Sequence, residues 1–306
     1  MQYSRWYIFL FTILFLTACE QQTPSGQQQR PLIVGTTGMI GDALRQIAGE
    51  SAEVGHLMGP GVDPHLFKAN PGDLALLRKA DLIVYNGLHL EGKMGDILEK
   101  MAEQKPVLAL GETLPDSLLI AHETYENAYD SHIWFDVDLW RQANAALADY
   151  LLDWRPTLAD TFRYRSARWQ EQLEKLHEEV RFDIRQIPDS SRVLITAHDA
   201  FRYFGKAYGI SVRGLQGIST VSEFGLKDRI DMTDFIVDRG IKAVFVESSV
   251  PEKYLQSVVE GCASKGHEVQ IGGTLYSDAM GKPGGPADTY LKMVRYNVRT
   301  IVDALK

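Results

Sequence analysis

Short apolar runs and longer helical patterns alternate along most of the chain. Eight runs are rich in aliphatic and β-branched residues and have the length of a strand: 32–35, 53–58, 81–85, 106–110, 192–196, 210–213, 241–246 and 268–271. Helical patterns separate most of them, for example 71–80 (with Asn70 and Pro71 as a typical helix start), 228–239 and 251–265. Strands that alternate with helices predict parallel sheets covered by helices on both faces. The first four and last four runs are similarly spaced, so the pattern predicts two similar α/β lobes.

An unusually long helical pattern lies between the two sets of runs. It begins after Pro156, continues to about Gln186 and is closed by Pro188. Its apolar residues recur on one helix face: Leu158, Phe162, Trp169, Leu173, Leu176, Val180, Ile184 and Ile187. A helix of about thirty residues is roughly 45 Å long, which is more than one small lobe needs. A coiled coil would need charged heptads over more turns, so the pattern favours a rigid strut that joins both lobes.

The first residues have the pattern of a bacterial export signal. Arg5 precedes an almost wholly apolar segment, 6–18, that is shorter than the roughly 20 residues of a membrane-spanning helix. The segment leads into LTAC at Cys19, which resembles a lipobox, where a cysteine is lipidated and becomes the new N-terminus. A plain secretory signal with an incidental cysteine is the alternative. Residues 19–30 are polar and glutamine-rich, as a flexible tether would be.

These patterns divide the chain into five predicted parts. They are a lipoprotein signal peptide (1–18), a lipid-anchored linker (19–30), an N-terminal α/β lobe (31–155), the connecting long helix (156–188) and a C-terminal α/β lobe (189–306). The chain is 45% hydrophobic, which is ample for globular cores, and its net charge of −8 argues against a nucleic-acid partner. The second cysteine, Cys262, falls in a helical pattern with Tyr254 and Val258, so we expect a buried structural thiol.

Histidine and carboxylate side chains stand near the ends of several predicted strands. His65 follows the second run in a Pro/Gly turn, His132 precedes a helix, His198 follows a buried strand and Asp278 follows the last run. Taken alone, His65, His132 and Asp278 are ordinary loop or turn residues, whereas His198, at the mouth of a buried parallel strand, is as readily functional as structural. The carboxyl ends of parallel strands in two facing lobes meet at one cleft, however, and ligands bind there in such sheets. Three imidazoles and one carboxylate at one cleft suit a divalent transition-metal ion.

The rest of the sequence offers no competing chemical signature. Five further histidines fit the cluster less well and are expected to be structural or surface residues: His56, His89, His122, His177 and His267. No CxxC, HExxH, P-loop or GxSxG pattern occurs, so zinc fingers, zincins, nucleotide-binding proteins and serine hydrolases lack their motifs.

Six segments make a family resemblance specific: MGPGVDPHLFKANPGD, YNGLHLEGKM, SHIWFDVDLW, TAHDAFRYFGKAYGISVRGLQGIST, VFVESSVPEK and IGGTLYSDAMG. They resemble the signature segments of the lipoprotein metal receptors of bacterial ABC importers. These receptors are the manganese/zinc cluster (A-I) of solute-binding proteins, some of which were named adhesins. The similarity runs from about Leu32 to Lys306 and implies an α/β fold of two (βα)4 lobes joined by one long rigid helix, with a metal site in the cleft between the lobes.

The resemblance also implies a ligand set. The four ligand positions of the family match His65, His132, His198 and Asp278, and Glu247 is a candidate for orienting a ligand from behind. An ion pair between the lobes is an equally open reading of Glu247. The long histidine-rich loop of zinc-dedicated members is absent, whereas His198 stands where manganese-dedicated members often have Glu. We expect one Mn²⁺ or Zn²⁺ per chain, with manganese favoured in function and zinc bound at least as tightly in vitro.

The implied function is metal capture rather than catalysis. We expect a monomeric, extracytoplasmic receptor that is held on the cell membrane by its N-terminal lipid, delivers its ion to an ABC permease with a separate ATPase, and binds no nucleic acid. One alternative is a metal-dependent hydrolase with Glu247 or Asp199 as general base, which would need an exchangeable water on the ion. The other alternative is a surface adhesin, although no segment resembles an adhesion module.

The long helix also bears on motion. It contains no Gly or Pro, so we expect the lobes to rock only slightly when metal is released. Glycines are frequent around Asp278, so we expect the segments around His198 or Asp278 to be the mobile ones.

Overall fold

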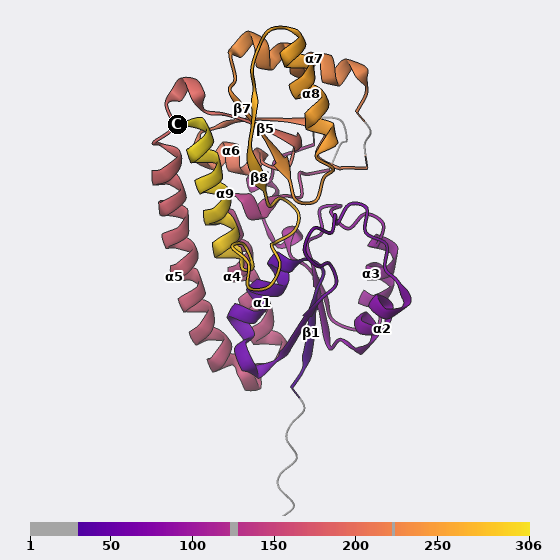
Figure 1. Ribbon diagram of the computed structural model, residues 1–306. Coiled ribbons are helices and arrows are strands. Elements are labelled where there is room, and N and C mark those ends of the chain that lie inside the picture. Colours follow the sequence, from indigo (N-terminus) through magenta and orange to yellow (C-terminus); the bar gives the residue numbers. More distant parts are fainter. Residues whose placement is uncertain (1–29, 123–127, 222–223) are drawn as a thin grey trace, which may run out of the picture. The chain divides into compact units, whose positions relative to one another are not determined.

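The computed structural model describes residues 30–122, 128–221 and 224–306, which contain two four-stranded parallel sheets (Figure 1). The strand orders are β2-β1-β3-β4 and β6-β5-β7-β8, the same arrangement twice. The strands are β1 (Leu32–Gly35), β2 (Glu53–His56), β3 (Leu82–Tyr85), β4 (Val107–Ala109), β5 (Val193–His198), β6 (Ser211–Gln216), β7 (Ala243–Glu247) and β8 (Gln270–Leu275). The eight predicted strands and the two similar lobes are therefore confirmed, with strand ends shifted by a few residues.

Helices cover both faces of each sheet because neighbouring strand residues point to opposite sides. In β1, Ile33 joins the core cluster that includes α1, whereas Val34 packs with Leu77 of α2 and Leu98 of α3. The helices are α1 (Gly38–Ala48), α2 (Pro71–Lys79), α3 (Gly95–Ala102), α4 (Val137–Trp154), α5 (Ala159–Ile184), α6 (Arg202–Tyr208), α7 (Leu226–Arg239), α8 (Lys253–Ser264) and α9 (Tyr290–Leu305). The predicted start of α2 is confirmed, since Asn70 caps it with Asp73 in a capping box.

The long helix α5 has the buried face that the sequence predicts. Phe162, Trp169, Leu173, Leu176, Val180 and Ile184 are all buried, and a short 3₁₀ turn, Pro156–Leu158, precedes the helix. The Trp169 indole also donates a hydrogen bond to the Asn144 side chain of α4 at 2.9 Å. The apolar face of α5 packs against α1, α4 and α9 of the same chain. The long helix is therefore part of the protein core and is not a coiled-coil helix.

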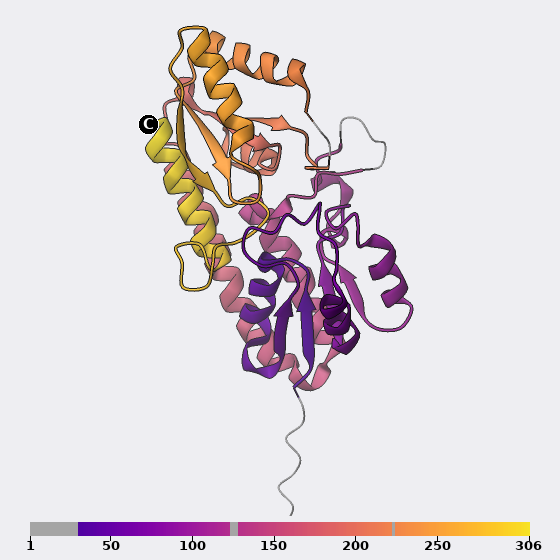
Figure 2. The ribbon, with the colours of Figure 1, turned by 45° about the vertical axis from the view of Figure 1, so that its right-hand side comes forward.

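The C-terminal helix α9 returns to the first lobe, which the strand pattern does not reveal. It lies along α5 in both views of the fold (Figures 1 and 2) and packs against α5 and α1. At its start, the backbone N–H of Tyr290 donates to the buried Asp42 carboxylate of α1 at 2.9 Å. The largest core cluster accordingly runs from β1 through α5 to α9. Two helices, α5 and α9, thus connect the lobes where the sequence predicts one.

The structure describes one of the two cysteines. Cys262 lies on α8 and is buried, as expected of a structural thiol. The predicted signal peptide (1–18), Cys19 and nearly all of the linker (19–30) lie outside the described residues. Within the described ranges, no helix is long and apolar enough to cross a membrane.

Candidate metal centre

Four side chains from four separate segments meet at one buried point. His65 lies in the loop after β2, His132 directly precedes a 3₁₀ turn, His198 is the last residue of β5, and Asp278 lies in the loop after β8. One ligand atom of each lies within 4.8 Å of the others. The exposed fractions of the four residues are 4%, 0%, 0% and 2% in chain order. The structure therefore brings together all four residues that the sequence singles out.

Three of the separations between these atoms match those of a metal coordination shell. His65 Nε2 lies 3.4 Å from His132 Nε2, and Asp278 lies 3.4 Å from His132 Nε2 through Oδ1 and 3.3 Å from His198 Nε2 through Oδ2. Ligands of a tetrahedral ion are separated by about 1.6 times the metal–ligand distance. A zinc–nitrogen distance of about 2.0–2.1 Å thus gives about 3.3–3.4 Å. Neither oxygen of Asp278 makes a hydrogen bond, although both are buried. A buried carboxylate without hydrogen bonds fits a cation-binding role.

Two of the histidines are oriented by carboxylates behind them. Asp130 Oδ1 lies 2.7 Å from His132 Nδ1 and also accepts the backbone N–H of His132 at 2.9 Å. Glu247 Oε2 lies 2.6 Å from His198 Nδ1, and its Oε1 accepts the backbone N–H of His198 at 2.8 Å. A proton held at Nδ1 leaves Nε2 with a lone pair that faces the centre, which is the tautomer that a metal ligand needs.

The positions of these carboxylates bear on the sequence predictions. Glu247 ends β7, which pairs with β5, so it contacts His198 within one sheet. The ligand and carboxylate set predicted from sequence does not include Asp130. The sequence does contain a local indication of its role. A carboxylate two residues before a histidine can reach the ring of that histidine when the backbone turns.

Hydrogen bonds between the lobes hold the segments of His132 and Asp278 together. The Trp134 indole N–H donates to the backbone oxygen of Ser277 at 3.0 Å, and the Tyr290 hydroxyl donates to the backbone oxygen of Trp134 at 2.8 Å. Both bonds are buried. The residues next to His132 and Asp278 are therefore fixed to each other and to the start of α9.

His65 is held differently from the other ligand candidates. Its backbone N–H donates to Asp63 Oδ1 at 2.8 Å, and its ring makes no hydrogen bond to a carboxylate among the described residues. The other five histidines lie outside the cluster. Of these, His177 on α5 meets the Tyr208 hydroxyl at 3.2 Å, and the His267 ring lies 2.7 Å from the backbone oxygen of Ile241.

The carboxylates reverse the effect of burial on two imidazoles. Desolvation lowers the pKa of His132, but Asp130 and Asp278 outweigh it and raise this pKa to about 9. Desolvation likewise lowers the pKa of His198, but Glu247 and Asp278 raise it well above the ordinary value. For Asp278, burial raises the pKa, and the two histidines hold it well below its usual range. The centre is therefore built to hold positive charge next to Asp278.

His65 shows the opposite balance. Desolvation is the largest effect on its pKa, and the neighbouring His132 and His198 add to it, so that the pKa falls to about 3 despite the attraction of Asp278. Its ring is thus neutral and ready to bind a metal ion at physiological pH.

Comparison with known proteins decides the family. The family model described as "Zinc-uptake complex component A periplasmic" matches residues 33–304, nearly all of the described chain. The chain belongs to this family. It is therefore an extracytoplasmic component of a metal ABC transporter and not an enzyme, which excludes the hydrolase alternative for Glu247 and Asp199.

Individual relatives agree with the family. The chain is 46% identical over 298 residues to the manganese-binding lipoprotein MntA of Bacillus subtilis, covering 97% of both proteins. It is also 46% identical over 276 residues to the zinc-binding protein TroA of Treponema pallidum, covering 90% of this chain and 89% of that protein. The solved structure of that protein superposes with a TM-score of 0.88, covering 90% of this chain and 99% of the other. The metal ABC transporter substrate-binding lipoprotein FimA of Streptococcus parasanguinis is 27% identical, covering 97% of this chain and 96% of that protein.

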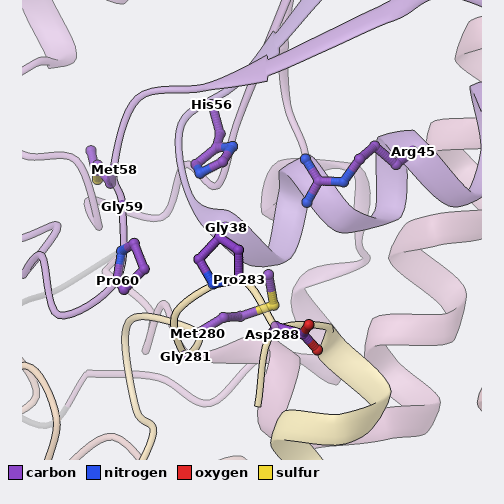
Figure 3. Close-up of a pocket in the computed structure, with 10 residues that line it drawn as sticks. All are labelled: Gly38, Arg45, His56, Met58, Gly59, Pro60, Met280, Gly281, Pro283 and Asp288. Atoms are coloured by element: carbon purple, nitrogen blue, oxygen red, sulfur yellow. The ribbon is translucent and has the colours of Figure 1, made fainter. Parts of the chain in front are cut away.

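A separate pocket of about 280 Å³ lies between α1, the segment after β2 and the segment after β8 (Figure 3). It is lined by Met58, Gly59 and Pro60 from the loop that carries His65, and by Met280 and Gly281 from the segment that follows Asp278. None of the four ligand candidates lines it. The pocket therefore adjoins two ligand-bearing segments of this metal-transport protein.

Metal binding should displace protons from the centre. Because the pKa of His132 is raised to about 9 and that of His198 is raised as well, both rings carry a proton at neutral pH that an incoming ion must replace. A raised pKa of His132 stabilises the protein before metal binds at pH values below about 6.5, and this stabilisation is lost as the pH rises through about 9. Thermal unfolding measured from pH 6.5 to 9 tests this. As the pH rises, the contribution of protonated His132 to the stability of the metal-free protein should fall, and the gain in Tm on adding Zn²⁺ should grow.

The Asp130→Asn variant is the control for this pH dependence. It removes the largest influence that raises the pKa of His132, so the gain in Tm should vary less with pH. A gain that is constant from pH 6.5 to 9 in the unmodified protein would contradict this electrostatic account.

Proposed function

We propose that His65, His132, His198 and Asp278 together bind one divalent transition-metal ion, which this receptor captures outside the cytoplasm and delivers to the permease of its ABC importer. The observation that carries the proposal is a set of three separations of 3.3–3.4 Å, one between the Nε2 atoms of His65 and His132 and two between a histidine Nε2 and an Asp278 oxygen. These separations suit a metal–ligand distance of about 2.0–2.1 Å. With four protein ligands, the ion needs no activated water, which fits transport rather than hydrolysis.

The ion in this proposal is Mn²⁺ or Zn²⁺. Three imidazole nitrogens favour zinc over manganese by ligand softness. Both Asp278 oxygens face ring nitrogens, so a bidentate carboxylate can raise the number of donor atoms to five, which suits manganese. The two 46%-identical relatives are named for manganese and for zinc respectively. We propose manganese as the physiological cargo and zinc as a competitor that binds at least as tightly in vitro.

The remaining parts of the chain receive roles that support capture and delivery. Asp130 and Glu247 fix the tautomers of His132 and His198 from behind. Residues 31–155 and 189–306 act as the two lobes and 156–188 as the strut between them. A lipid on Cys19 and the tether 19–30 hold a monomeric receptor at the membrane, near the permease and its ATPase.

Graded loss of metal affinity tests the ligand assignment. His132→Ala removes one proposed ligand, so isothermal titration with Zn²⁺ and Mn²⁺ should show loss of the high-affinity site. Glu247→Gln keeps all four ligands but weakens the orientation of His198, so affinity should fall by about 10–100-fold. Metal uptake by cells that carry each variant should fall in the same order.

Matched controls separate this result from general damage. His89 is exposed and has a positive φ of 63°, which Asn tolerates, so His89→Asn should leave metal affinity unchanged. The exposed Glu252 at the start of α8 serves as the control for Glu247, as Glu252→Gln. Unchanged stoichiometry and affinity in His132→Ala would remove His132 from the site and overturn the proposed ligand set.

Membrane attachment through Cys19 has its own test. Cys19→Ala should move the protein from the membrane fraction to the soluble fraction, because no lipid can be attached. Cys262→Ala is the matched control and should stay with membranes, since Cys262 is buried on α8. A Cys19→Ala protein that remains in the membrane fraction would show that the lipobox interpretation is wrong.

A further inference from the structure

One hydrogen bond joins the lobes directly beside the metal centre without being fully buried. The Thr220 hydroxyl donates to Asp63 Oδ2 at 2.6 Å, and both residues are half-buried. The bonds from Trp134 to Ser277 and from Tyr290 to Asp42 also join the lobes, and both of these are buried. The Thr220–Asp63 bond is therefore more open to water and easier to break than these.

Asp63 connects this bond to a ligand candidate. Its second oxygen, Oδ1, accepts the backbone N–H of His65 at 2.8 Å, and Pro64 between them limits the freedom of the turn. One carboxylate thus uses one oxygen for the loop of His65 and the other for the opposite lobe. The position of the His65 backbone depends on whether Asp63 keeps both partners.

Thr220 is in turn connected to the sheet that carries His198. Its backbone oxygen accepts a hydrogen bond from the Gln216 side chain at 2.8 Å, and Gln216 pairs with His198 in the ladder between β5 and β6. The contacts therefore run from His65 through Asp63 and Thr220 to Gln216 and His198. They link a ligand candidate of one lobe to a ligand candidate of the other.

His65 needs this support more than the other three residues do. The rings of His132 and His198 rest on Asp130 and Glu247, and the Asp278 segment is bonded to Trp134 through Ser277. Within 30–122, 128–221 and 224–306, no carboxylate makes such a contact with the ring of His65. The glycines near Asp278 favoured mobility around His198 or Asp278 at the level of sequence, whereas these contacts leave His65 as the least restrained of the four.

We propose that the Thr220–Asp63 hydrogen bond is a latch that controls how long the ion stays bound, with Asp63 as a positioning residue for His65. While the bond is intact, the loop holds His65 against the ion. When it breaks, His65 withdraws first and the ion is released through the remaining three ligands. The latch rests on the proposed function, since it acts on metal held by His65.

The latch should act on release more than on capture. A hydrogen bond to a charged group that is half exposed changes an equilibrium by about five- to tenfold. Interactions that form after encounter change dissociation rates more than association rates. Loss of the Thr220 hydroxyl should therefore speed ion release by about five- to tenfold and leave capture almost unchanged.

The test compares Thr220→Val, which keeps the shape but loses the donor, with Thr220→Ser, which keeps the donor. The purified proteins are loaded with Zn²⁺, and ion release is followed after mixing with excess EDTA. Thr220→Val should release the ion about five- to tenfold faster, and Thr220→Ser should release it at nearly the rate of the unmodified protein. Ser219→Ala, in the same loop, is the control and should also match the unmodified protein.

A second comparison isolates the pair. If Thr220 acts through Asp63, then adding Thr220→Val to Asp63→Ala should cause no further acceleration. Equal release rates for Thr220→Val and the unmodified protein would overturn the latch while leaving metal binding intact. Fast release by Thr220→Ser or Ser219→Ala would also overturn it, because the loop and not the hydrogen bond would then be responsible. An unmodified protein that binds no Zn²⁺ would overturn the proposed function and the latch together.

Discussion

The structure depends on keeping three imidazoles and one carboxylate close together and away from water. Removing these groups from water costs free energy, and the two Asp278 oxygens do not regain it through hydrogen bonds. Positive charge beside Asp278 offsets this cost, whether as protons on His132 and His198 or as a bound cation. Competition between protons and metal for the same position follows directly from this arrangement.

The fold serves this constraint by delivering each side chain from a separate segment. Parallel strands end at the centre, so His198 and Glu247 come from neighbouring strand ends and reach each other without a long loop. The lobes are held together by α5 and by the packing of α9 against α5 and α1, where the bond from Tyr290 to Asp42 is buried. With the lobes joined in this way, we expect local parts, such as the loop of His65, to respond to the ion. This suits a receptor of a metal ABC transporter, which must release the ion that it captures.

Much of this arrangement could be predicted from sequence because it depends on local patterns. Strand runs, the apolar face of α5 and the position of His198 at a strand end follow from short-range periodicity. The return of α9 could not be predicted, because an amphipathic helix does not state which surface it covers. The Trp134–Ser277 and Thr220–Asp63 bonds could not be predicted either. They join residues far apart in the chain through side-chain geometry that only packing determines.

Asp130 lies between these cases, since it is local but its role depends on a backbone turn that residue types alone do not specify. Glu247 was accessible as a residue at a strand end, yet its partner became clear only from the pairing of β7 with β5.

X-ray absorption of the zinc-loaded protein tests the central claim most directly, because it reports the atoms bound to the ion. The account predicts three imidazole nitrogens and one or two carboxylate oxygens at about 2.0–2.2 Å. A spectrum that requires sulfur, or that fits fewer than three imidazole rings, would contradict the buried three-histidine, one-aspartate centre as the site of metal capture.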